Sequence, residues 1–293
     1  MSNYNCISKH GKPHRFEIIK YPDGQQNVKL DLNYFDNPKY PVRIKCSIRS
    51  WQELEVLMCL IAAFKSEDFI IHDIVIMYMF GLRSDRKFDL GSCNYVKDVI
   101  APILQKINDE CAHTISIYKP HGRIFDYIDT HSYKNPIYIR TPDLFQHMLK
   151  IGADKSAIEI VSNFSDFIRP EDIIHFDKIR SKKDIILNMK DHFLEKVKSS
   201  ELPIVIMDDL CDGGATFIAC AEYLRDSGIV SSDRKLYLFV HHGLFSKGFE
   251  ELFSHFDRIY TTNSYKKFPQ NPDDPLHIPE SKLHVIDVWS PNE

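Results

Sequence analysis

The stretch that most constrains the fold is residues 202–216, LPIVIMDDLCDGGAT. Its apolar run, Ile204-Val205-Ile206-Met207, has the length and the β-branching of a strand that is buried on both faces. Two adjacent carboxylates, Asp208 and Asp209, follow this run, and residues 217–225 favour a helix after a short loop. A buried strand followed by a loop and a helix predicts an α/β fold with a mainly parallel sheet.

The loop between this strand and this helix also predicts an anion site. In an open parallel sheet, ligands bind beyond the carboxyl ends of the strands, where the N–H groups at a helix start hold phosphate. Glycine lets the backbone approach such a group closely, and two neighbouring carboxylates suit ribose hydroxyls or Mg²⁺ beside a phosphate. A polar strand end with a glycine turn has the same pattern, so the residues alone leave both interpretations open. The loop runs Asp212-Gly213-Gly214-Ala215-Thr216.

Composition excludes several classes of protein. A chain of 293 residues is long enough for two domains, and a net charge of −4 gives no reason to expect nucleic-acid binding. No apolar run reaches membrane-spanning length, and the polar start does not resemble a secretory signal. The 7 cysteines are scattered and form no CxxC pair, which favours core thiols in a reducing cytosol. We therefore expect a cytoplasmic α/β protein without a membrane or nucleic-acid partner.

The rest of the chain alternates strand and helix patterns. In the first half we expect a hairpin of residues 16–20 and 27–32, strands at 42–48, 69–80 and 114–118, and helices at 51–65 and 94–108. In the second half we expect helices at 142–151 and 244–253, and strands at 157–161, 173–176, 235–240, 258–262 and 283–288.

Three charged or polar features admit two interpretations each. The basic segment 81–87, the lone His121 and the segment 177–183 are each more often a solvated surface than a ligand site. In this chain all three follow predicted strands, which is also where ligand-binding loops lie.

Four motifs resemble one family, and they occur in its order along residues 16–288. The acidic loop is similar to the ribose-phosphate loop of type I phosphoribosyltransferases and of phosphoribosyl pyrophosphate (PRPP) synthetases, which has two acidic residues, two apolar ones and Asp-Thr-x-Gly-Thr. YMFGLRSDRKF, residues 78–88, resembles the YFGYARQDRKF-type segment of PRPP synthetases. Residues 21–25, YPDGQ, resemble their aromatic-x-Asp-Gly-Glu turn, and residues 177–183 their Asp-Lys-Arg-Arg segment. The basic segment favours the PRPP synthetase (ribose-phosphate pyrophosphokinase) family, of which this chain resembles a divergent, phage-like member.

The resemblance implies two phosphoribosyltransferase-type α/β domains related by a pseudo-repeat, an ATP-binding one at 1–140 and a ribose-phosphate-binding one at 141–293. It implies that ATP is a co-substrate, that Mg²⁺ is needed, and that a small-molecule acceptor receives pyrophosphate while AMP leaves. It also implies a homo-oligomer. The residues that it assigns to ATP are Tyr21, Asp23, Gln25, Arg83, Asp85, Arg86 and His121. Those assigned to the ribose and its phosphate are Asp208, Asp209, Asp212, Gly213, Gly214, Ala215 and Thr216. The catalytic cations would be Lys178, Arg180 and Arg83, and the metal ligands His121 and Asp208.

Departures from the family motifs shape the expected substrate. Gln25 replaces Glu in the adenine-side turn, and the family's Pro-Asp-x-Gly-Gly loop has no match at residues 162–166, where Asp166 is the candidate acid. Gly213 replaces the first Thr of the phosphate loop. A hydroxyl donor lost to a charged acceptor is worth about 1.5–3 kcal/mol, so a terminal phosphate dianion should be held less well. The acceptor is therefore either ribose 5-phosphate or a substituted form such as ADP-ribose, as in NAD salvage. A phosphoribosyltransferase and a non-catalytic regulatory subunit remain alternatives.

Overall fold

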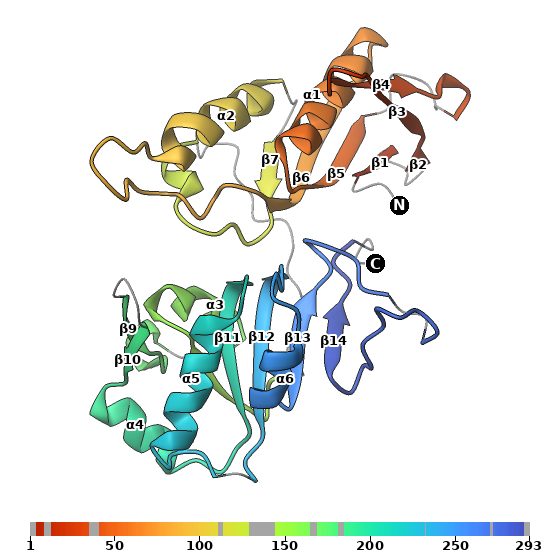
Figure 1. Ribbon diagram of the computed structural model, residues 1–293. Coiled ribbons are helices and arrows are strands. Elements are labelled where there is room, and N and C mark those ends of the chain that lie inside the picture. Colours follow the sequence, from red (N-terminus) through yellow and green to blue (C-terminus); the bar gives the residue numbers. More distant parts are fainter. Residues whose placement is uncertain are drawn as a thin grey trace. The chain divides into compact units, whose positions relative to one another are not determined.

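The computed structural model describes residues 4–8, 13–34, 41–110, 114–128, 144–164, 169–180, 185–231, 233–269 and 272–289. It divides the chain into two compact units, Met1–Tyr138 and Ile139–Glu293. Each unit is an α/β structure built on a five-stranded sheet (Figure 1). The predicted α/β class with mainly parallel sheets is confirmed. No helix in the ranges given above is both long and apolar enough to cross a membrane.

The N-terminal unit has the sheet order β2-β1-β5-β6-β7. Strands β5, β6 and β7 run parallel to one another. Strand β1 is antiparallel to β5, and β2 is antiparallel to β1. A separate hairpin, β3-β4, precedes β5. The strands are β1 Tyr4–Ser8, β2 Pro13–His14, β3 Phe16–Lys20, β4 Gln26–Leu30, β5 Val42–Ile48, β6 Ile71–Met79 and β7 Thr114–Ile117. The helices are α1 Trp51–Ser66 and α2 Ala101–Asp109, with a π-helical turn Val96–Ile100 before α2 and short 3₁₀ turns Leu32–Tyr34 and Ile124–Asp126.

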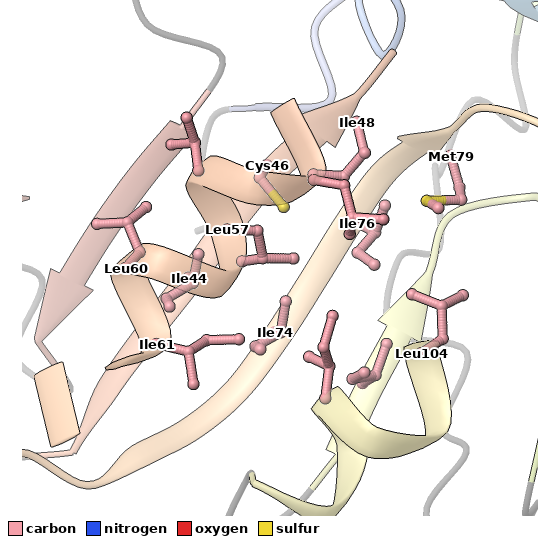
Figure 2. Packing of buried hydrophobic residues seen from close by; sticks show 14 of the residues in the cluster. Ile44, Cys46, Ile48, Leu57, Leu60, Ile61, Ile74, Ile76, Met79 and Leu104 are labelled. Atoms are coloured by element: carbon pink, nitrogen blue, oxygen red, sulfur yellow. The ribbon is translucent and has the colours of Figure 1, made fainter. Parts of the chain in front are cut away.

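Helix α1 begins where its sequence provides a cap. The Ser50 side chain accepts a hydrogen bond from the backbone N–H of Glu53 at 3.3 Å, which satisfies one free donor of the first turn. The apolar stripe of α1 then packs on alternate residues of the parallel strands (Figure 2). The side chains that interlock in this core are Ile44, Cys46, Ile48, Leu57, Leu60, Ile61, Ile74, Ile76 and Leu104.

The C-terminal unit has a fully parallel sheet in the order β14-β13-β12-β11-β8. Its strands are β8 Leu149–Gly152, β11 Ile204–Cys211, β12 Leu236–Gly243, β13 Arg258–Thr262 and β14 Leu283–Ile286, and a two-stranded hairpin is formed by β9 Asp177–Arg180 and β10 Ile185–Asn188. Its helices are α3 Ile158–Asn163, α4 Asp191–Lys198, α5 Ala215–Asp226 and α6 Glu250–His255, with 3₁₀ turns Lys155–Ala157 and Pro170–Asp172.

Strand β11 is buried on both faces, as its apolar run predicts. Ile204 and Ile206 belong to the core that packs under α4, α5 and α6. Val205 and Met207 belong to a second core on the other face, which includes residues of α3. Figure 1 shows α5 and α6 side by side over one face of this sheet.

Two predicted elements at the start of this unit are wrong. Residues 149–152, expected to end a helix, form β8 because they pair in register with residues 204–207 of β11. Residues 157–161, expected to be a strand, lie in the turn Lys155–Ala157 and in α3. The reason is local: the Asp154 carboxylate accepts the Ser156 N–H at 2.8 Å, and this cap starts the turn that leads into the helix despite the β-branched residues that follow.

Other predictions need smaller corrections. Residues 173–176 contribute a single bridge, from His175 to Gly152, and the strand is the next segment, β9, where a solvated loop was expected. The helix predicted at 244–253 begins only at Glu250, because residues 244–248 turn back onto the end of β11. Strand β11 extends through Asp208 and Asp209 instead of ending before them. The remaining predicted strands and helices are confirmed to within a few residues.

Candidate active site

The loop after β11 has a backbone conformation that strongly favours glycine. Gly214 has φ +86°, and a Cβ atom on it would lie 2.9 Å from Leu252 Cδ2. Its carbonyl oxygen accepts the Phe217 and Ile218 N–H groups at 2.9 and 3.1 Å, so α5 starts directly after it. The first N–H groups of a helix have no partner within the helix and carry its positive dipole end. The predicted phosphate loop, Asp212 to Thr216, therefore lies at a helix start that suits an anion.

Asp208 is a carboxylate whose negative charge is disfavoured by its surroundings. Its side chain is half-buried, and its Oδ1 accepts the Asp209 N–H at 2.9 Å. Burial, followed by the negative charges of Asp209 and Asp154, raises the pKa of Asp208 well above its usual range. A cation or a hydroxyl donor bound here would relieve this repulsion, so the position favours a metal ion or a ribose hydroxyl.

Asp154, at the carboxyl end of β8, is a site residue that the sequence analysis missed. Its Oδ2 lies 3.3 Å from Lys178 Nζ, and the Lys178 side chain is only 8% exposed. Burial of Asp154 opposes its ionisation, but the hydrogen bond from Ser156 and the charge of Lys178 outweigh burial and lower the pKa of Asp154. The structure thus brings Lys178, from β9, to the acidic end of β8 and β11. The signal that could have found Asp154 is its position after a strand, but that strand was predicted as a helix.

The segment 244–248 after β12 is held against the phosphate loop. The Leu244 and Ser246 N–H groups donate to the carbonyl oxygens of Cys211 and Asp212 at 2.9 and 3.0 Å. The Ser246 hydroxyl also donates to Asp212 Oδ1 at 2.6 Å. The start of the segment is also held by Lys266, whose Nζ donates a hydrogen bond to the Leu244 carbonyl at 2.9 Å. Asp212 therefore fixes a neighbouring loop by its side chain.

The ends of β12 and β13 are joined by a buried polar network. His242 Nδ1 lies 2.8 Å from the Ser264 hydroxyl, and the Thr262 hydroxyl donates to the His241 carbonyl at 2.6 Å. All four residues are buried. These contacts fix the strand ends.

Two cysteines close to the loop are not nucleophiles. Burial raises the pKa of the Cys211 thiol to about 12, and it raises the pKa of the Cys220 thiol as well. Both groups stay protonated near neutral pH. Cys46, Cys211 and Cys220 are core thiols as predicted, whereas Cys59 is partly exposed and Cys93 is exposed.

The residues predicted to hold ATP fall into two groups of the N-terminal unit. Tyr21, Asp23 and Gln25 form the exposed turn of the β3-β4 hairpin, where the Gln25 N–H donates to Asp23 Oδ1 at 3.1 Å. The hairpin packs on α1, whereas the long loop after β6 extends past α2 on the other side of the unit in Figure 1. The structure does not bring these two groups together.

The second group consists of the loop after β6 and the segment after β7. Asn94 Nδ2 donates to the Asp85 carbonyl at 2.7 Å, which fixes the loop. A Cβ atom on Gly122 would lie 2.9 Å from Asp85 Oδ2, so the segment of His121 touches this loop. Arg83 and Arg86 are exposed on it, and Arg86 lies over the Phe88 ring at 5.6 Å. The structure therefore joins the predicted basic loop to the segment that carries His121.

Comparisons with known proteins agree with this arrangement of motifs. No family model matches the chain. The ribose-phosphate pyrophosphokinase of Pyrococcus abyssi (strain GE5 / Orsay) is 26% identical to it over 246 residues, which cover 83% of this chain and 81% of that protein. The crystal structure of phosphoribosylpyrophosphate synthetase from Mycobacterium smegmatis superposes with a TM-score of 0.65 at 14% identity, covering 94% of this chain and 86% of that one. In sequence the chain resembles a ribose-phosphate pyrophosphokinase, and in fold it resembles a PRPP synthetase.

Some predicted site residues of this PRPP-synthetase-like protein are not placed with the others. The backbone of Arg180 ends β9, but its side chain lies outside the described part, as does all of Asp166. Among the side chains that the structure describes, no three of His, Cys, Asp and Glu are arranged to hold a metal ion. The two predicted metal ligands, His121 and Asp208, belong to different units. Mg²⁺ commonly uses only one or two carboxylates together with substrate phosphates, so the acidic end of β11 still fits a metal that arrives with its nucleotide.

Proposed function

We propose that this protein is a diphosphokinase that transfers pyrophosphate from Mg·ATP to the anomeric hydroxyl of a ribose 5-phosphate moiety. The observation that carries the proposal is the arrangement around β11. An acidic pair, a glycine loop at a helix start and the buried cation of Lys178 occur together there. Sequence similarity to a ribose-phosphate pyrophosphokinase supports the same reaction.

The acceptor would bind to the C-terminal unit. Asp208 and Asp209 would accept hydrogen bonds from the ribose hydroxyls. The 5-phosphate would lie on the loop from Asp212 to Thr216, where N–H groups and the positive end of the α5 dipole stabilise an anion. Lys178, held by Asp154, would supply positive charge where the transferred group develops negative charge.

ATP would bind to the N-terminal unit. Arg83 and Arg86, exposed on the loop after β6, provide the charge that a triphosphate requires, and His121 lies beside this loop. Tyr21, Asp23 and Gln25 are proposed for the adenine side on the sequence resemblance alone, because the structure of the unit does not bring them to the basic loop. His121 in this unit and Asp208 in the C-terminal unit are each proposed as a ligand of Mg²⁺, which supplies Lewis-acid stabilisation of phosphate oxygens when bound.

The proposed chemistry is a single in-line displacement. The oxygen of the anomeric hydroxyl forms a bond to the β-phosphorus of ATP, and the bond from that phosphorus to the α–β bridging oxygen breaks. AMP leaves with this oxygen, and the hydroxyl proton passes to solvent or to a nearby carboxylate. The product is a 1-pyrophosphate, and no covalent enzyme intermediate is formed.

The acceptor itself is ribose 5-phosphate or ADP-ribose, and Gly213 favours ADP-ribose. The missing hydroxyl weakens the hold on a terminal phosphate dianion, whereas each phosphorus of a pyrophosphate diester carries one charge less. ADP-ribose pyrophosphate would be the product in that case.

The test is AMP release from Mg·ATP by the purified protein, with ribose 5-phosphate and ADP-ribose as parallel acceptors. AMP formation that depends on either acceptor supports the proposal, and the preferred acceptor decides its specificity. Turnover of a ribose pyrophosphate without ATP would instead indicate a phosphoribosyltransferase. A protein that is inactive with both acceptors but alters the rate of a PRPP synthetase would be a regulatory subunit.

Two further features belong to the proposal. The resemblance favours a homo-oligomer, which light scattering after gel filtration would test. It also favours action on small molecules in the cytoplasm, which fractionation of cells that express the protein would test.

A further inference from the structure

The backbone conformation at Gly213 does not require a glycine. Unlike Gly214, it does not adopt the left-handed conformation that favours glycine. The space that its side chain would fill is occupied by Lys247, whose Cδ, Cε and Cγ atoms lie 3.2, 3.3 and 3.4 Å from the position of a Cβ atom. The absence of a side chain at 213 therefore makes room for the stem of Lys247.

Lys247 lies there because its segment is fixed. It follows Ser246, whose N–H and hydroxyl both donate to Asp212, and it precedes Gly248, which has φ +78°. The Lys247 side chain is exposed and forms no ion pair with any residue in the described ranges. Among the described residues, Asp212 is the carboxylate whose contacts place it at this loop. It already accepts a hydrogen bond from the Ser246 hydroxyl. The Lys247 charge is thus available to a ligand on the loop.

We infer that Lys247 binds a phosphate group of the acceptor and makes the loop selective for a ribose 5-phosphate moiety that carries a second phosphate. This inference rests on the proposed function and names the substrate class of the same site. The family's threonine at this place would offer one fixed hydroxyl, whereas a lysine offers a mobile point charge on a four-carbon stem. Such a charge would serve a second phosphate beside the one that the loop N–H groups hold.

The alternative is a lysine that only covers the loop. An exposed lysine stem that packs on glycine shields apolar surface without any ligand. This alternative predicts no dependence of affinity on the Lys247 charge, which separates it from the inference.

The experiment measures binding of ADP-ribose and of ribose 5-phosphate by calorimetry, with Mg²⁺ and without ATP. We expect Lys247→Met to weaken ADP-ribose binding by about tenfold, the effect of about 1.4 kcal/mol, and ribose 5-phosphate binding much less. Lys247→Arg keeps the charge and should retain most of the affinity. Lys198→Met, at the exposed end of α4, removes the same charge elsewhere and should change neither affinity.

A reciprocal variant tests the role of Gly213. Gly213→Thr restores a hydroxyl donor and displaces the Lys247 stem, and the backbone permits the change. We expect the preference to move from ADP-ribose toward ribose 5-phosphate.

The outcomes separate the two proposals. Equal loss of both acceptors in Lys247→Met, or no loss of either, would overturn the inference while AMP release by the wild type still supported the proposed function. A wild-type protein that bound neither acceptor and released no AMP would overturn the proposed function itself, and the inference with it.

Discussion

At the scale of one residue, Asp208 is a candidate site residue whose negative charge lowers the stability of the folded protein. Its carboxylate lies beside Asp209 and near Asp154, and burial and these charges raise its pKa. Functional sites commonly keep such unfavourable charges because the ligand needs them. An uncharged side chain of the same shape should therefore stabilise the fold and remove the activity.

We expect Asp208→Asn to raise the melting temperature near neutral pH and to lower AMP release by about 100-fold or more. Because the folded pKa of Asp208 is raised, its favourable contribution is complete below the ordinary aspartate value of 3.8 and is lost as pH rises through the folded pKa. The stability gain of the variant should therefore grow as pH rises from acid to neutral. Thermal melts at several pH values measure it. A variant that is less stable at neutral pH would contradict this account of the Asp208 charge.

Lys178 makes a second prediction at this scale. Its side chain is nearly buried and is held by Asp154 at 3.3 Å, so its ammonium is positioned before substrate binds. If it stabilises charge mainly in the transition state, Lys178→Ala should lower kcat by about 100- to 1000-fold and change KM for the acceptor by less than about threefold. Lys198→Ala serves as the control. Equal effects on kcat and on KM would assign Lys178 to substrate binding instead.

At the scale of elements, the start of α5 determines the site. Gly214 combines a left-handed backbone with a close approach to Leu252 of α6, so the loop and two helices depend on one residue. Gly228, just beyond the other end of α5, has φ +68° with nothing near its Cβ position. A comparison of substitutions at Gly214 and Gly228 therefore distinguishes the cost of a left-handed backbone from the cost of a steric contact.

Gly228→Ala should destabilise the protein by about 1 kcal/mol, the cost of placing a non-glycine residue in this conformation. Gly214→Ala should cost more, about 2–3 kcal/mol, because the methyl group also meets Leu252. It should weaken acceptor binding as well, which Gly228→Ala should not do. Urea unfolding and acceptor calorimetry measure both effects. Equal stability losses in the two variants would contradict this prediction, because they would show that Leu252 of α6 moves away from the new methyl group without cost.

At the scale of the whole molecule, the chain has separate hydrophobic cores. Among the described residues, one core lies within 28–124, and two lie within 145–283, on the two faces of the second sheet. Each unit therefore has its own source of stability, and the proposed ligands are assigned to different units.

We expect scanning calorimetry to depart from a single two-state transition, as is usual for chains with two domains. An acceptor at 100 times its Kd stabilises the unit that binds it by about 2.7 kcal/mol. Ribose 5-phosphate or ADP-ribose should therefore raise the transition of the C-terminal unit, and ATP that of the N-terminal unit. Hydrogen exchange identifies which residues become protected. Protection of β11 and α5 by ATP alone would contradict the assignment.

Features that depend on neighbouring residues could be predicted from the amino-acid sequence. The buried strand β11, the amphipathic helix α1 and the glycine loop at α5 are confirmed because periodicity, capping and backbone freedom are local properties. Predictions failed at residues 149–161, where strand pairing overrode helix propensity and a single Asp cap overrode β-branching.

Which distant residues meet depends on the tertiary fold. Asp154 and Lys178 are separated by 24 positions, and Ser246 and Asp212 by 34. No local pattern specifies these contacts. Ser246 meets Asp212 because the parallel strands β11 and β12 place their carboxyl ends at one edge of a sheet. Lys178 reaches Asp154 from the separate β9-β10 hairpin. The chemistry of the loop could be read from its residues. The buried lysine beside its carboxylates and the lysine stem over Gly213 required the folded sheet.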